Sequence, residues 1–183
     1  PAAHSTMPRH DPIGTRFEVN VGTVVHQALA WLADHTDHSS ARVRACVENS
    51  ARSSMVPPEE ETALVHSALH HIDNVLADPD GLWLLEAHAE HAAELELTGV
   101  VDDQIYHHVL DRTFVVDGVR WIIDYKTDHL SGDVDDFVHT QTSRYAAQLQ
   151  RYAQLALAVF AEPVQTALYF TAIPKLQPLE LVE

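Results

Sequence analysis

The chain has 183 residues and 46% of them are hydrophobic, which suits one domain with a sizeable core and excludes a disordered chain. The 27 acidic residues outnumber 11 Lys and Arg, and the formal net charge of −16 argues against a broad basic surface that grips nucleic acid. That charge does not exclude an active site that touches phosphates only through metal ions and a few cations.

The first half of the chain reads as helices. Residues 1–18 mix Pro, His and Ser without a period, which indicates a linker or an N-terminal arm. Apolar residues recur at helical spacing over residues 20–34, and Asn20 can cap that helix. Residues 39–51 predict a shorter helix. A third helix begins at the prolines before residue 59, carries acids in its first turn, and stops at Pro79 and Gly81.

The second half changes character. Residues 82–127 are rich in β-branched and aromatic residues and contain turn signals, which predicts a meander of strands. Helical spacing returns over residues 138–161, and residues 164–173 predict a late strand that Pro174 closes. This order favours an α/β or α+β domain over residues 19–183. The opening lacks an initiator Met, so we expect a fragment of a longer chain.

The pair Asp117-Gly118 between two apolar runs is a strong hairpin signal, because both central residues of a type I′ turn need positive φ. A two-residue turn pairs Val116 with Val119 and places Asp111 opposite Asp124 on one face. Alternation puts Lys126 on the same face as Asp124.

Two opposed carboxylates repel each other unless a cation lies between them. Mg²⁺ or Mn²⁺ would suit these hard oxygen ligands, and Lys126 could orient or deprotonate a water or hold a phosphate oxygen. The alternative is that Asp111 and Asp124 face water and Lys126 forms an ordinary surface ion pair with them. The two strands by themselves leave both interpretations open.

Four short blocks in this chain follow one another in the order found in a known family. They are Gly22-Thr23-Val24-Val25-His26, Asp111-Arg112, Asp124-Tyr125-Lys126-Thr127, and Tyr145, Gln148, Leu149 and Tyr152. The set resembles the C-terminal nuclease domain of RecB- and AddA-type helicase–nucleases, within the PD-(D/E)XK superfamily. The resemblance implies a restriction-endonuclease-like α/β fold, with a central mixed β-sheet flanked by α-helices.

The resemblance also implies roles for these residues. His26, Asp111, Asp124 and the backbone carbonyl of Tyr125 would bind Mg²⁺ or Mn²⁺, Lys126 would assist the attacking water, and Gln148 and Tyr152 would brace the site or touch DNA. Related domains often have one more Glu on the preceding strand, and Glu90 is preferred here over Glu94 and Glu96.

This chain departs from the family pattern in two ways. The glycine of the usual G-x-x-D-R block is replaced by His107, His108, Val109 and Leu110 on the approach to Asp111. The cysteines of an iron–sulfur staple, found in some related nucleases, are absent. His107 and His108 are expected on the surface, as are Arg42, Arg44 and Arg52 and the histidines His66, His70 and His71.

We therefore expect a magnesium-dependent deoxyribonuclease, an exonuclease that acts in double-strand-break repair and recombination. Its partners would be single-stranded DNA ends, a helicase motor in the same chain or complex, and partner helicase–nuclease subunits. The alternatives are a catalytically inactive nuclease-fold module and a stand-alone RecB-like nuclease. One cysteine, no signal segment and no membrane-length apolar run are typical of a cytoplasmic protein without a membrane partner.

Overall fold

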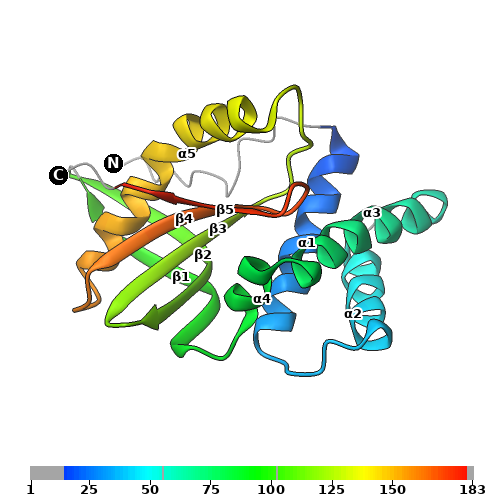
Figure 1. Ribbon diagram of the computed structural model, residues 1–183, viewed down its shortest axis with the longest axis horizontal. Helices are drawn as coiled ribbons and strands as arrows, with labels where there is room; N and C mark the ends of the chain where they lie inside the picture. The colour runs from blue at the N-terminus through cyan, green and yellow to red at the C-terminus, as the bar shows by residue number, and fades with distance from the viewer. Residues whose placement is uncertain (1–14, 55, 102, 181–183) are drawn as a thin grey trace, which may run out of the picture.

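The computed structural model describes residues 15–54, 56–101 and 103–180 of the chain. These residues form five helices and five strands, shown along the chain in Figure 1. In chain order the elements are α1 (Arg16–Ala33), α2 (Ser40–Ser53), α3 (Pro58–Ala77), α4 (Pro79–Leu85), β1 (Ala89–Val101), β2 (Gln104–Val116), β3 (Val119–Lys126), α5 (Val134–Leu157), β4 (Val164–Phe170) and β5 (Lys175–Leu179).

The first helix begins earlier than Asn20, the cap that we expected. Thr15 accepts a hydrogen bond at Oγ1 from the backbone N–H of Glu18, and the Glu18 carboxylate accepts one from the backbone N–H of Thr15. This reciprocal capping box starts α1 at Arg16. Of the linker predicted for residues 1–18, residues 16–18 are the first turn of this helix, and residues 1–14 lie outside the described residues.

The third helix ends just before Pro79 and Gly81, as predicted, but a further helix that was not predicted begins at Pro79. Helix α3 ends at Ala77, but Asp78 accepts a hydrogen bond from the N–H of Gly81 and caps a new helix, α4, with Pro79 in its first turn. Proline is well tolerated there, because the first N–H of a helix has no partner within it. Strands therefore begin at Ala89 and not near residue 82.

The five strands form one mixed sheet in the order β1-β2-β3-β4-β5. Only β3 and β4 are parallel, and α5 is the crossover between them. Figure 1 shows α5 along one face of the sheet and α1 to α4 gathered on the other. The expected mixed sheet flanked by helices is confirmed. The edge strand β5, which follows Pro174, was not predicted.

Each face of the sheet has its own hydrophobic core. The core under α1 to α4 includes Phe114, Ile123 and Tyr125 of the central strands. The core under α5 includes Leu110 and Ile122. None of the helices in the described part of the chain is both long enough and apolar enough to cross a membrane.

The tight turn between β2 and β3 is confirmed. Asp117 and Gly118 have φ of 52° and 75°, and Val116 pairs with Val119. Regular pairing continues to Arg112 opposite Ile123 and stops there, one position before Asp111 and Asp124. The sheet thus opens between β2 and β3 at the point where the predicted acidic residues lie.

Candidate active site

Side-chain alternation is interrupted in the middle of β1 and β2. Leu110 packs in the core under α5, whereas Phe114 packs under α1 to α4, although even spacing would put both on one face. The interruption falls where Glu94, with φ of 54°, would pair with Asp111, since regular pairs flank this position on both sides. An irregularity of this kind redirects side chains, and it turns Glu94 and Asp111 toward α1.

His26 of α1 meets this pair of acids. Its Nδ1 lies 3.2 Å from Oδ1 of Asp111, and one ligand atom from each of His26, Glu94 and Asp111 lies within 4.8 Å of the others. Gly22 explains how α1 comes so near. A Cβ on this residue would lie 3.2 Å from Oγ1 of Thr127, just beyond the end of β3, so glycine permits the close approach of the helix.

The electrostatic environment favours the charged forms of both groups. Burial opposes a charge on His26, but the carboxylates of Asp111 and Asp124 outweigh it and raise the pKa of His26. Burial likewise works against the Asp111 carboxylate, but His26, the N–H of Tyr125 and the charge of Lys126 together lower the pKa of Asp111. The negative carboxylate is a suitable ligand for a divalent cation, and the imidazole becomes a ligand when the cation displaces its proton.

Asp124 and Lys126 form the second part of the site, on the face that α5 covers. The Lys126 ammonium lies 2.5 Å from Oδ2 of Asp124 and 3.6 Å from the centre of the Tyr145 ring. Burial opposes the charge on Lys126, but Asp124, Tyr145 and Asp111 outweigh it and raise the pKa of Lys126. Lys126 is therefore a buried cation at neutral pH, with its charge next to the carboxylate.

Helix α5 holds the other oxygen of Asp124. Gln148 donates a hydrogen bond from Nε2 to Oδ1 of Asp124 at 3.1 Å, and the Tyr152 hydroxyl donates to the same oxygen at 3.4 Å. Gln148 also donates to the Tyr152 hydroxyl. The two residues are four positions apart on one helix face, as the sequence indicated. Both sequence-predicted bracing residues therefore contact the acid of β3.

The predicted face-to-face arrangement of the two acids is not formed. Asp111 turns toward α1 and Asp124 toward α5, because regular pairing ends before them and alternation is broken at Asp111. They still belong to one cluster, since Oδ2 of Asp111 accepts a hydrogen bond at 2.9 Å from the N–H of Tyr125, the residue after Asp124.

Burial raises the pKa of the Tyr152 hydroxyl, and the negative charges of Asp124 and Asp111 raise it further.

Tyr125 and Glu90 are placed differently from the other predicted residues. The Tyr125 side chain is buried under α1, where its ring meets the His26 ring edge-on, so only its backbone could bind a cation. Glu90 lies away from the cluster, because its carboxylate accepts a hydrogen bond at 2.6 Å from the buried Arg120. Glu94, an alternative to Glu90 in the sequence, is the glutamate beside His26 and Asp111.

The residues present fit a divalent metal ion. Besides the histidine and two carboxylates described above, Oδ2 of Asp124 is buried and makes no hydrogen bond among the described residues. The nearby Lys126 ammonium balances the negative charge of this oxygen, but the two groups are not in hydrogen-bonding geometry. A buried anionic oxygen of this kind, close to a histidine and carboxylates, is what Mg²⁺ or Mn²⁺ prefers.

Arg112, the second residue of the Asp-Arg block, has a structural role. Its buried guanidinium donates to the backbone carbonyls of Leu84 at 3.1 Å and Glu86 at 2.8 Å. It therefore ties the end of α4 to β2, one residue from Asp111. Regular alternation would put these adjacent residues on opposite faces, but the interruption at Asp111 turns both toward the side of α1 to α4.

Two histidines that we expected on the surface are not there. His71 is buried, and its Nδ1 lies 2.9 Å from Oγ1 of Thr171, which itself donates to the carbonyl of Lys126 at 3.1 Å. His108 is half-buried, and its ring lies 5.0 Å from that of Tyr152. Their spacing along the sequence contained no signal for these contacts, which depend on distant parts of the chain.

Comparison with known proteins agrees with this geometry. The family model described as the PD-(D/E)XK nuclease superfamily matches residues 6–182. An AddA-type ATP-dependent helicase/nuclease protein from Carboxydothermus hydrogenoformans is 26% identical over 177 residues, which cover 88% of this chain and 15% of that protein. The resemblance to AddA-type nuclease domains is thereby confirmed.

A solved structure supports the fold. A candidate exonuclease from Eubacterium rectale has a TM-score of 0.61 at 14% identity, over 93% of this chain and 60% of that one. This chain spans less than two thirds of the length of each of these two proteins.

Proposed function

Because the chain belongs to the PD-(D/E)XK nuclease superfamily, we propose that it is a metal-dependent DNA nuclease domain that hydrolyses phosphodiester bonds. The observation that carries the proposal is the gathering of His26, Glu94 and Asp111 within 4.8 Å beside the Asp124–Lys126 pair. These groups come from α1, β1, β2 and β3, and they meet where the sheet opens.

His26, Asp111 and Asp124 would hold Mg²⁺ or Mn²⁺, with Glu94 in place of Glu90 and with the carbonyl of Tyr125 as a further ligand. When bound, the ion supplies a water of lowered pKa and a positive charge for the phosphate. The carboxylates and the imidazole would contribute to metal binding as ligands whose positions are fixed in advance, because each side chain comes from a helix or strand of the fold.

Lys126 acts as a cation in this proposal. Its raised pKa keeps it protonated at neutral pH, so it stabilises negative charge on the phosphate or on the attacking oxygen and does not serve as a base. Tyr145 covers one side of the ammonium and limits its movement. Gln148 and Tyr152 hold Oδ1 of Asp124, so that Oδ2 stays beside Lys126.

The cellular setting is also a proposal. The relative is named as part of a helicase/nuclease and is far longer than this chain, which supports residues 19–183 being the nuclease part of such a polypeptide. A motor in the same chain or complex, with partner subunits, would then deliver single-stranded DNA ends during double-strand-break repair. The site would act on those ends as an exonuclease.

A catalytically inactive module is the main alternative. The same fold can serve to guide DNA, but such a module has no need for a buried ion pair beside further acids. Taking a lysine and an aspartate out of water costs free energy that hydrophobic residues of similar size would not cost. The retained Asp124–Lys126 pair, with Lys126 only 1% exposed, therefore favours an active nuclease.

The test is cleavage of an end-labelled single-stranded oligonucleotide by the purified chain with Mg²⁺, with Mn²⁺ and with a chelator. We expect cleavage that requires the metal and that falls at least a hundredfold in Asp124→Asn and Lys126→Met, which keep the side-chain size. Glu90→Gln is the matched acidic control and should retain cleavage. Equal cleavage by the wild type and both variants would contradict the proposal.

A further inference from the structure

Among the residues that the structure describes, few cations lack a carboxylate partner. In the described residues, each Lys and Arg except Arg16, Arg112, Arg144 and Arg151 forms an ion pair with an Asp or Glu. Arg112 is buried and bonded to backbone carbonyls, and Arg16 is in the first turn of α1. The remaining two, Arg144 and Arg151, are both on α5.

Arg144 and Arg151 flank the residue that holds the catalytic acid. They lie four positions before and three positions after Gln148, so the three side chains share one flank of the helix. Gln148 itself contacts Asp124. Two positive charges without a carboxylate partner among the described residues therefore lie on either side of the residue that contacts Asp124.

Each of these arginines lies against an aromatic ring, and each ring is connected through further contacts to the residues of the site. The Arg144 guanidinium lies 5.0 Å from the centre of the Tyr145 ring, which is also the ring beneath the Lys126 ammonium. The Arg151 guanidinium lies 5.6 Å from the Tyr106 ring, which stacks on His108. His108 in turn meets Tyr152, the residue that bonds Asp124.

Two polar atoms at this flank have unused hydrogen-bonding capacity. Nε of Arg151 and Nε2 of His108 are buried from solvent and make no hydrogen bond within the described residues. Buried donors and acceptors normally have partners, and a bound phosphate or base edge would provide them.

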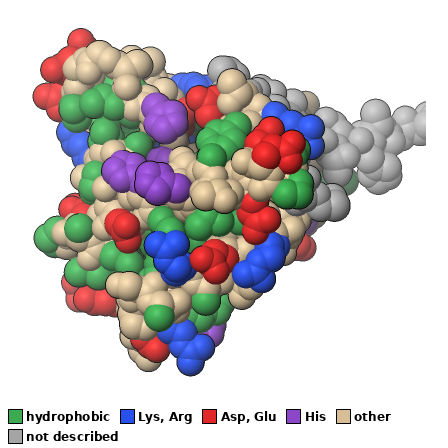
Figure 2. All heavy atoms as spheres, turned by 90° about the vertical axis from the view of Figure 1, so that its right-hand side faces the viewer, with side chains coloured by type: hydrophobic (Ala, Val, Ile, Leu, Met, Phe, Trp, Pro, Cys, Tyr) green, Lys and Arg blue, Asp and Glu red, His purple; other side chains and the backbone are tan. Residues whose placement is uncertain are grey.

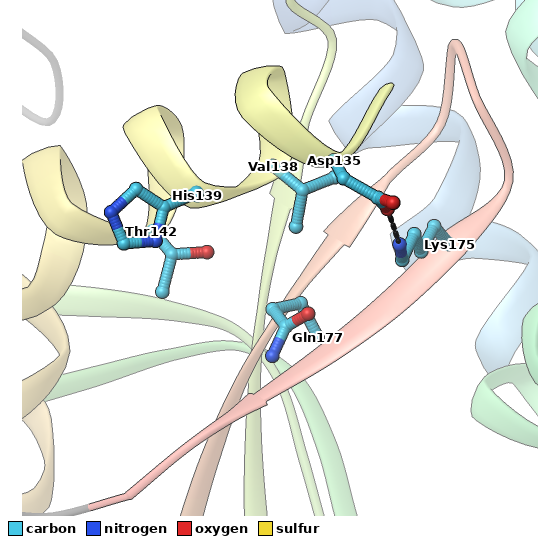
Figure 3. Close-up of a pocket in the computed structure, with 6 residues that line it drawn as sticks. All are labelled: Asp135, Val138, His139, Thr142, Lys175 and Gln177. Atoms are coloured by element: carbon cyan, nitrogen blue, oxygen red, sulfur yellow. Dashed lines mark hydrogen bonds and ion pairs between the residues drawn. The ribbon is translucent and has the colours of Figure 1, made fainter. Parts of the chain in front are cut away.

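The opposite flank of α5 differs. A polar pocket of about 200 Å³ lies there, between α5 and β5, and Figure 3 shows Asp135, His139, Lys175 and Gln177 among the side chains around it. Its one cation, Lys175, is bonded to Asp135 at 3.2 Å, so it offers no free positive charge. A phosphate backbone would therefore favour the flank with the arginines.

We propose that Arg144 and Arg151 bind the phosphates on either side of the scissile one, so that a single DNA strand lies along this flank of α5. This inference rests on the proposed function, since it extends the same site. A DNA strand carries a negative charge at every nucleotide, and two guanidiniums with fixed spacing hold two such charges. Tyr106 and His108 would offer flat faces to the bases.

Helix α2 provides a matched control. Arg42 and Arg44 have the same charge as the α5 pair but lie beside Asp37 and Glu48 in exposed ion pairs. Figure 2 shows that, on the face it views, basic side chains lie next to acidic ones and several His side chains gather near the middle. Removing the α2 arginines changes the net charge equally without touching the proposed strand path.

The experiment measures binding of a fluorescent single-stranded phosphorothioate oligonucleotide to the chain in Ca²⁺, over a series of salt concentrations. We expect Arg144→Gln with Arg151→Gln to lower the slope of log Kd against log salt by about 1.4, because each phosphate contact on a single strand contributes about 0.7. Arg42→Gln with Arg44→Gln should keep the wild-type slope. Arg144→Lys with Arg151→Lys should keep most of it, since the charge remains.

Unchanged slope in the α5 glutamine variant, an equal loss in the α2 variant, or no binding by the wild type would each overturn the inference. Thermal unfolding of every variant establishes that the fold is intact. If the wild type binds with the expected slope but does not cleave in Mg²⁺ or Mn²⁺, the nuclease proposal fails while the strand path stands.

Discussion

Gln148 donates a hydrogen bond from Nε2 to Oδ1 of Asp124 at 3.1 Å, although the two residues are 24 positions apart in the chain. The bond joins the crossover helix to the strand that it follows. It leaves Oδ2 of Asp124 facing Lys126 and otherwise open, so the orientation of the acid depends on α5.

Replacing Gln148 with Leu should therefore disturb the acid without removing it. We expect metal-dependent cleavage to fall by roughly 10- to 100-fold, as is typical when a group that orients a metal ligand is lost. The loss should fall mainly on kcat, because Gln148 acts on the cleavage step by orienting Asp124. Single-turnover cleavage measures the loss in rate, and calorimetry with Mn²⁺ measures the metal affinity. Gln150→Leu, on an exposed position of the same helix, is the control. If Gln148→Leu cleaved DNA as fast as the wild type, Gln148 would not be needed to orient Asp124.

The two glutamates of β1 provide a sharp comparison. Glu94 lies with His26 and Asp111, so Glu94→Gln should weaken Mn²⁺ binding by about tenfold or more. Glu90→Gln, which only alters the ion pair with Arg120, should leave Mn²⁺ affinity unchanged. Isothermal calorimetry of both variants checks this, and the reverse order of effects would restore Glu90 as the metal ligand.

His71 makes stability depend on pH. Burial, together with His129 and His70, lowers the pKa of His71 to about 4, below its ordinary value of 6.5. Between these values the unfolded chain binds a proton that the folded chain does not, so the free energy of unfolding falls as pH drops from about 6.5 to about 4. The loss should reach roughly 3 kcal/mol.

Urea unfolding at pH 7 and pH 4.5, in the presence of a chelator, measures this effect. His71→Asn keeps an N–H near the Nδ1 position that faces Thr171, so it should fold with a much smaller loss at pH 4.5. The lowered pKa of Asp111 acts in a separate window, below its ordinary value of 3.8. An identical pH dependence in both proteins would assign the loss to other groups.

Gly81 in α4 tolerates no side chain. A Cβ on this residue would lie 2.2 Å from the carbonyl oxygen of Val75 and 2.7 Å from the Tyr169 hydroxyl. Gly81→Ala should therefore destabilise the protein by about 3 kcal/mol or more, since backbone atoms must move. Chemical denaturation measures the cost, with Asp80→Ala on the exposed side of the same turn as the control. A wild-type unfolding midpoint for Gly81→Ala would contradict the packing described for α4.

Much of the fold followed from local patterns. The Asp117-Gly118 turn predicted the register of β2 and β3, because a two-residue loop leaves only one way to pair the flanking residues. The long helices followed from their apolar period. Helix α4 and β5 were missed, because a capping aspartate before Pro79 and a short edge strand after Pro174 give only weak local signals.

The residue types of the site could also be found in the sequence, since His26, Asp111, Asp124 and Lys126 stand in blocks whose order is typical of one family. Which way each carboxylate points could not be found there. The interruption at Glu94 and Asp111 sends Asp111 to His26 and leaves Asp124 to α5, and the same interruption makes Glu94 the neighbouring acid while Glu90 pairs with Arg120. Short-range periodicity is encoded by adjacent residues, whereas the direction of a side chain at an irregular strand position depends on packing against helices that are distant in the chain.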